Sequence, residues 1–227
     1  MVSPALTVNE LTTGMKLTLE EFLSRWEAIP ELKKAELING VVYVPSPVGI
    51  DHWTKDTKLI GWLDRYAEET PGCEAGNNGT WVMLGQAPQP DSFLCILESH
   101  GGAWQDKAGL SEGAPELAVE ICVSSTGMEF GPKLALYQRA GVLEYITIES
   151  AAKRVVWRAL VDGRYEAIEP DADGVLKSRC FPGLWLDTGA YLSGDRKRIS
   201  QALRTGMATP EHDQFVDELA RRATEKA

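Results

Sequence analysis

The chain has 227 residues, of which 44% are hydrophobic and 25% are charged, and its formal net charge is −10. This length and apolar content predict one principal globular domain with a sizeable core. The sequence shows neither a run of eighteen apolar residues nor a basic-then-apolar leader, so we expect no membrane span or secretory signal and a cytoplasmic location.

The N-terminal third is predicted to contain a helix, a hairpin and a second helix. Residues 1–17 lack periodicity and are interpreted as an arm. Thr18 and Glu21 have capping-box spacing, which predicts a helix to about Ala28. Asn39-Gly40, between alternating residues, predicts a hairpin over residues 35–45. Apolar positions at helical spacing predict a helix over residues 51–69.

Two acidic residues mark the strands that follow. After an expected strand at residues 81–84, Asp91 opens the apolar stretch 92–97, which places this acid at the beginning of a strand and near a sheet edge. Glu120 interrupts the apolar run 117–123, which predicts a central strand. A carboxylate buried there is costly unless a cation or hydrogen-bond donors compensate it.

Lys133 begins a helical pattern that stops at Gly141, with Pro132 and Gly141 as start and stop signals. Lys133 and Tyr137 are four residues apart and share a helix face. From the first turn, Lys133 can reach back toward the strand of Glu120.

The C-terminal part is predicted to extend the sheet and end in helices. Residues 154–160 and 165–168, joined at Asp162-Gly163, indicate an antiparallel extension. Residues 211–226 form an amphipathic pattern, interpreted as a helix for packing or oligomerisation. We therefore divide the chain into an arm (1–17), a principal domain (18–194) and a C-terminal helical extension (195–227).

Taken together, these motifs resemble the PD-(D/E)XK nuclease superfamily, and within it the bacterial Uma-two family of "putative restriction endonucleases". The resemblance covers roughly residues 18–190. Its pieces are Leu19 to Phe22, Glu36 to Gly40, His52, Pro90-Asp91, Pro115 to Glu120, Lys133 with Tyr137, Ala140 to Tyr145, and Phe181 to Leu184. Their order and spacing carry the match.

The resemblance implies an α/β (mixed α+β) fold, with a restriction-endonuclease-like core in which helices flank a mixed sheet. It implies that Asp91 and Glu120 bind Mg²⁺ or Mn²⁺ and that Lys133 serves the attacking water or the transition state. Glu36 matches a further family acid and is a candidate fourth site residue, and His52 matches a family position near the site.

The sequence departs from the family pattern at two places in this region. The wider superfamily carries its lysine two residues after the glutamate, where this chain has Cys122, so the lysine has moved to the helix. The loop Val123 to Thr126 replaces a Ser-Pro step and could take a different course toward Lys133.

Three functions agree with these motifs. The first is a metal-dependent endonuclease that hydrolyses DNA phosphodiester bonds. The alternative is a catalytically inactive binding or assembly module on the same scaffold, and the third is an enzyme for a small phosphorylated substrate. The resemblance also suggests a homodimer or larger assembly.

Structural explanations compete for each residue. Glu120 could be solvated or paired with Arg, Asp91 could be a turn residue, Lys133 could be exposed, and His52 could be a cap.

The net charge and the cysteines limit which ligands the chain is expected to bind. The charge of −10 argues against a simple DNA-coating protein, although a local basic strip can coexist with it, and Arg196 to Arg198 form the densest positive cluster. The four cysteines, at positions 73, 95, 122 and 180, are scattered singly, so buried thiols are expected and a zinc site is not.

Overall fold

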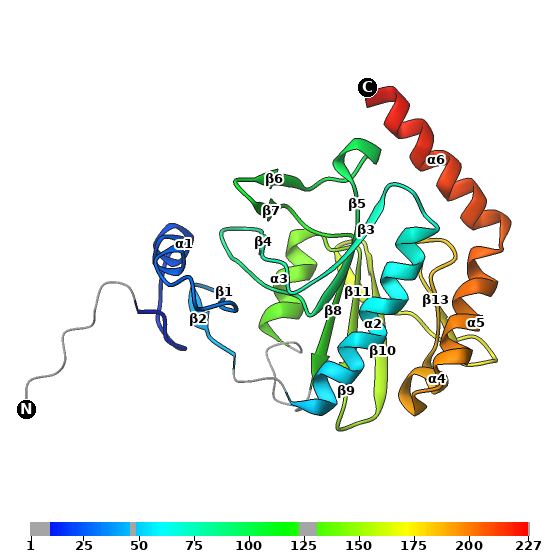
Figure 1. The fold of residues 1–227 in the computed structure, drawn as a ribbon, viewed down its shortest axis with the longest axis horizontal. Coiled ribbons are helices and arrows are strands. Elements are labelled where there is room, and N and C mark those ends of the chain that lie inside the picture. The colour runs from blue at the N-terminus through cyan, green and yellow to red at the C-terminus, as the bar shows by residue number, and fades with distance from the viewer. Residues whose placement is uncertain (1–9, 46–48, 123–130, 227) are drawn as a thin grey trace, which may run out of the picture.

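A six-stranded mixed sheet organises the chain (Figure 1). In a computed structural model, which describes residues 10–45, 49–122 and 131–226, its strand order is β11-β10-β9-β8-β5-β3. β8 and β9 pair in parallel, and the other neighbours pair antiparallel. The strands are β3 (Cys73–Asn77), β5 (Ser92–Ile96), β8 (Leu117–Cys122), β9 (Glu144–Glu149), β10 (Arg154–Val161) and β11 (Arg164–Ala167).

The central strands are the ones that the sequence marks as apolar. Every residue of β8 and β9 is buried, as expected for strands covered on both faces. The extension of β10 and β11 turns at Asp162 and Gly163, whose φ angles are 47° and 77°. The expected mixed sheet with an antiparallel extension is therefore confirmed.

Helices cover both faces of this sheet (Figure 1). On one face, α2 (Ile50–Glu68) buries Trp62 and Tyr66 in a cluster that includes Val119 of β8. On the other, α3 (Pro132–Ala140) packs Leu136 against Ala118, the neighbour of Val119 along the strand. Successive residues of a strand point to opposite faces, so these two helices enclose the sheet between them.

The N-terminal elements form a third buried cluster. Helix α1 (Leu19–Glu27) carries the predicted capping box, because Thr18 and Glu21 exchange side-chain to backbone hydrogen bonds. The predicted hairpin is also confirmed: β1 (Glu36–Ile38) and β2 (Val41–Tyr43) turn at Asn39 and Gly40, whose φ angles are 53° and 72°. Both residues lie in the left-handed region that such a turn requires.

A small second sheet lies beside the main one, and the sequence predicts only its first strand. It has the order β4-β7-β6, with β4 (Trp81–Val82), β6 (Gln105–Lys107) and β7 (Leu110–Glu112). A short 3₁₀ helix, η1 (Glu98–His100), precedes β6 in the chain. The strand expected at residues 81–84 is shorter, because Leu84 and Gly85 have φ angles of 51° and 71° and turn the chain.

The C-terminal elements pack on the α2 side of the main sheet. Phe215 and Leu219 of the predicted last helix are buried in the same cluster as Trp62. The elements are β12 (Val175–Lys177), β13 (Trp185–Asp187), α4 (Thr188–Ser193), α5 (Arg196–Met207) and α6 (Pro210–Lys226). The division of the chain at residues 18 and 195 stays a prediction, and residues 1–9 of the expected arm lie outside the described part.

Two further expectations concern membranes and thiols. Within the described ranges, no helix combines the length and the apolar character needed to cross a bilayer. Cys73 and Cys95 are buried free cysteines, and Cys122 is buried in β8.

Candidate metal centre

Asp91 lies immediately before β5, with its carboxylate buried against the neighbouring strand. Its Oδ2 accepts a hydrogen bond from the backbone N–H of Ile121 at 2.8 Å. The register of the two strands pairs Ser92 with Val119, and one further step sets Asp91 opposite Glu120. Asp91 begins a strand near a sheet edge, as expected, because β5 is separated from that edge only by β3.

Two basic side chains contact the Asp91 carboxylate. The Nε2 atom of His52 lies 3.2 Å from Oδ2, and the Nζ atom of Lys34 donates to Oδ1 at 3.3 Å. Burial alone would raise the pKa of Asp91, but His52 and the ammonium groups of Lys34 and Lys133 outweigh it and lower that pKa to about 2. The same hydrogen bond raises the pKa of His52. Asp91 is therefore a stable anion, and His52 is biased toward its cationic form.

Glu120 is buried in β8 and meets two donors from α3. The Lys133 Nζ and the Tyr137 hydroxyl each donate to its Oε1 at 2.8 Å. The two donors come from successive turns of the helix, as their four-residue spacing predicts. Only 2% of Glu120 and 3% of Lys133 are exposed, so neither is the solvated surface group that the competing interpretation requires.

Glu36 completes this cluster from the N-terminal hairpin. Its Oε1 lies 2.8 Å from the Lys133 Nζ and accepts the backbone N–H of Gln89 at 2.6 Å. The ammonium of Lys133 is therefore shared by two buried carboxylates. Asp91, Glu120, Lys133 and Glu36 are all brought into one region, and their roles stay predictions.

Burial and neighbouring charges together shift the pKa values in this cluster. Burial raises the pKa of Glu120, and the charges of Asp91 and Glu36 add to this shift while Lys133 opposes it. Burial would lower the pKa of Lys133, but the three carboxylates reverse this and raise it. The Lys133 ammonium thus faces three carboxylates, while Lys34 and His52 offset the charge of Asp91.

Two site residues are missed by sequence reasoning. Lys34 precedes the hairpin in a Lys-Lys pair without a distinguishing pattern, and only the fold brings it to Asp91. Asp56 lies one turn after His52 on α2, and its Oδ1 accepts the Ser92 hydroxyl at 2.9 Å. Burial raises the pKa of Asp56, and the nearby charge of Asp91 adds to the shift. The four-residue spacing from His52 is the signal that could have identified Asp56.

The donor set suits a hard divalent cation. Asp91 and Glu120 present carboxylate oxygens from adjacent strands, the ligand type that Mg²⁺ prefers, and waters usually complete its coordination. Among the described residues, no three His, Cys, Asp or Glu side chains are grouped to hold a metal ion, and the Lys133 ammonium lies between Glu36 and Glu120. The site therefore offers two protein ligands at most in this arrangement.

The sheet order, the flanking helices and the acids on adjacent central strands define a restriction-endonuclease-like fold. The chain belongs to the Uma2 family, described as "Putative restriction endonuclease", whose model matches residues 19–189. The loop Val123 to Thr126, where the sequence departs from the family pattern, lies outside the described residues.

A solved structure supports the same fold. The chain resembles the crystal structure of a "putative nuclease belonging to DUF820" from Anabaena variabilis ATCC 29413 at 19% identity and a TM-score of 0.58. The match covers 78% of this chain and 99% of that one. A comparison with curated proteins finds no match.

Proposed function

We propose that the protein is an endonuclease that hydrolyses DNA phosphodiester bonds with Mg²⁺ or Mn²⁺. The observation that carries the proposal is the placement of Asp91 opposite Glu120 on adjacent strands, with the Lys133 ammonium 2.8 Å from Glu120. Family membership supports the nuclease class.

Each residue of the cluster has a distinct part in this proposal. Asp91 and Glu120 would hold the divalent cation, which supplies an activated water and screens charge on the phosphate oxygens. Lys133 would donate hydrogen bonds to the attacking water or to the charge that develops on the phosphate. His52 and Lys34 would orient Asp91, and Tyr137 would orient Glu120.

Glu36 contacts the ammonium of Lys133 as closely as Glu120 does, at 2.8 Å. This arrangement fixes where the positive charge lies before substrate binds, and preorganised charge costs no rearrangement during the reaction. Glu36 is thus a positioning residue in the proposal.

The test is cleavage of supercoiled plasmid with Mg²⁺ or Mn²⁺. Asp91→Asn and Lys133→Met should each reduce the rate at least ~100-fold, by analogy with the loss of one preorganised stabilising group. Asp64→Asn, an exposed acid on α2, and Lys107→Met, which is 73% exposed, are matched controls and should retain the rate. Cleavage that survives both site substitutions, or appears with neither metal, would exclude the proposal.

The inactive binding module remains the alternative, favoured by the ion pairs that Lys133 makes with both Glu36 and Glu120. Calorimetric titration with Mn²⁺ separates the two functions. A nuclease should bind the ion in a way that Asp91→Asn abolishes, whereas a module in which Lys133 permanently replaces the cation should not bind it. Self-association and a cytoplasmic location stay predictions, and sedimentation velocity tests the first.

A further inference from the structure

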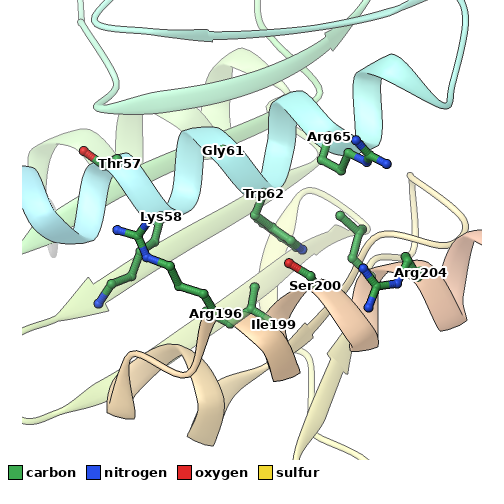
Figure 2. Close-up of a pocket in the computed structure, with 10 residues that line it drawn as sticks. Thr57, Lys58, Gly61, Trp62, Arg65, Arg196, Ile199, Ser200 and Arg204 are labelled. Carbon is green, nitrogen blue, oxygen red and sulfur yellow. The ribbon is translucent and has the colours of Figure 1, made fainter.

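A cationic groove lies between α2 and α5 (Figure 2), and its lining contains none of the residues of the acidic cluster that the structure describes. Its volume is about 430 Å³. Lys58 and Arg65 line it from α2, and Arg196 and Arg204 line it from α5. None of the described residues lining the groove is acidic, although the whole chain has a net charge of −10. The groove therefore attracts anions on a protein that otherwise repels them.

Three of these four cations lack an acidic partner in the described part of the chain, although Arg204 donates a hydrogen bond to Gln201 and Lys58 lies over the ring of Tyr191. Within the described ranges, Lys58, Arg196 and Arg204 form no ion pair. Arg65 lies 3.2 Å from Glu68 and 3.6 Å from Glu69, but all three side chains are more than half exposed. Ion pairs of that kind contribute little and exchange readily. The positive charge is available to a ligand.

The cations stand in two groups. Figure 2 shows Lys58 and Arg196 at one end of the groove and Arg65 and Arg204 toward the other, with Trp62 and Ser200 between them. Lys58 and Arg65 are seven residues apart on α2, which corresponds to roughly 10 Å along a helix axis. A single phosphate cannot meet both groups, whereas an extended polyanion with phosphates at intervals can.

A glycine on α2 leaves the floor of the groove open. Gly61 lies in the interior of α2, and a Cβ added there would meet no atom within 4 Å. Glycine weakens a helix interior, and no packing contact requires it at this position. Its effect is to leave the floor open between the two groups of cations.

Helix α2 connects this groove to the acidic cluster. His52, at the N-terminal end of α2, contacts Asp91, and the adjacent Trp53 is 51% exposed. Trp53, Thr57 and Gly61 recur at four-residue spacing, so they share one face of the helix. A ligand held in the groove can thus continue along that face toward the cluster.

We propose that the groove between α2 and α5 binds the phosphodiester backbone of nucleic acid at a site separate from the hydrolytic centre. The choice of nucleic acid as the ligand rests on the proposed function, because nucleic acid is the substrate proposed there. Binding in the groove itself requires neither a metal ion nor cleavage. Contacts to phosphates carry no base information, so the groove would hold nucleic acid irrespective of sequence.

The test is fluorescence anisotropy of a labelled 20-base-pair duplex in EDTA, across a range of salt concentrations. Arg196→Glu with Arg204→Glu should weaken binding at least tenfold and make the salt dependence shallower by about two released counterions. The matched control is Arg139→Glu with Arg164→Glu, two exposed arginines on α3 and β11 that change the net charge equally. The control should bind within about threefold of the original chain.

A second variant tests the shape of the groove. Gly61→Gln adds a neutral side chain to the open floor and should weaken duplex binding several-fold while the salt dependence stays steep. Circular dichroism and thermal unfolding verify that each variant folds.

Several outcomes would overturn the inference. An equal loss of duplex affinity in the groove variant and in the control variant would show that only the overall charge matters. A mononucleotide that saturates the groove and is not displaced by DNA would show that the groove is a site for small anions. An absence of measurable duplex binding by the original chain would also overturn it.

Failure of this inference is separable from failure of the proposed function. Metal-dependent cleavage together with unchanged duplex binding by the groove variants would refute only the inference about the groove. Duplex binding that depends on the groove, without cleavage in Mg²⁺ or Mn²⁺, would refute only the proposed nuclease function.

Discussion

Replacing Lys133 with methionine should destabilise the fold strongly, because it removes a buried cation and leaves its partners. Lys133 is 3% exposed and lies 2.8 Å from both Glu36 and Glu120. Removing one partner of a buried ion pair typically costs about 3–5 kcal/mol. Methionine nearly fills the volume of the lysine stem, so the loss reports charge and not a cavity.

The sign of the pH dependence follows from the carboxylates that remain. Burial already raises the pKa of Glu120 above its ordinary value of 4.5, and without Lys133 that pKa should rise further. The folded variant then binds more protons than the unfolded chain, so its stability increases as the pH falls toward 4.5 and decreases as the pH rises. The deficit relative to the original chain should therefore be largest near pH 8 and shrink near pH 5.

Urea denaturation at several pH values measures this directly. Lys107→Met, at a largely exposed lysine, should change the free energy of unfolding by no more than about 0.5 kcal/mol. Adding Glu36→Gln to Lys133→Met should recover part of the loss, because it removes one uncompensated charge. A Lys133→Met variant within about 1 kcal/mol of the original chain, at every pH, would refute the assignment of a buried, charge-compensating lysine.

Three further outcomes are expected. The pKa of Asp91, lowered to about 2, predicts a contribution to stability that is present above pH 3.8 and lost as the pH falls toward 2, and acid titration of Asp91→Asn should lack that component. Gly61→Ala should stabilise the protein by up to about 1 kcal/mol in thermal unfolding, whereas Gly206→Ala should destabilise it, because its Cβ would lie 2.3 Å from the backbone oxygen of Gly183. Glu144→Gln should cost about 2–4 kcal/mol in urea denaturation, because this buried carboxylate accepts four hydrogen bonds and an amide offers only one acceptor oxygen.

The elements found from the sequence are those with local signals. The capping box of Thr18 and the turn at Asn39-Gly40 depend on side chains within four residues, so their geometry can be read without the fold. Strands β3, β6 and β7 have no such signal. β3 contains Gly76, whose position is packed under the ring of Phe93, a contact that exists only after the strands pair.

The residues of the candidate site also fall into those with a local sequence signal and those without one. The charge of Glu120 within an apolar run and the helical start before Lys133 can be recognised locally. That Glu36 would meet Lys133, and that Lys34 would meet Asp91, depends on how a hairpin far away in the sequence docks on the sheet. Spacing along the chain contains no information about such contacts.

The docking of that hairpin makes the acidic cluster depend on two separately buried regions. Glu120 and Asp91 belong to the main sheet, but Glu36 is carried by β1, whose Leu37 is buried in the N-terminal cluster. If that N-terminal cluster opened alone, the lysine would lose one of its counter-charges while the sheet stayed intact. Hydrogen exchange would then detect exchange of the hairpin amides before that of the β8 amides. While the hairpin is open, the Lys133 ammonium would be paired with Glu120 alone.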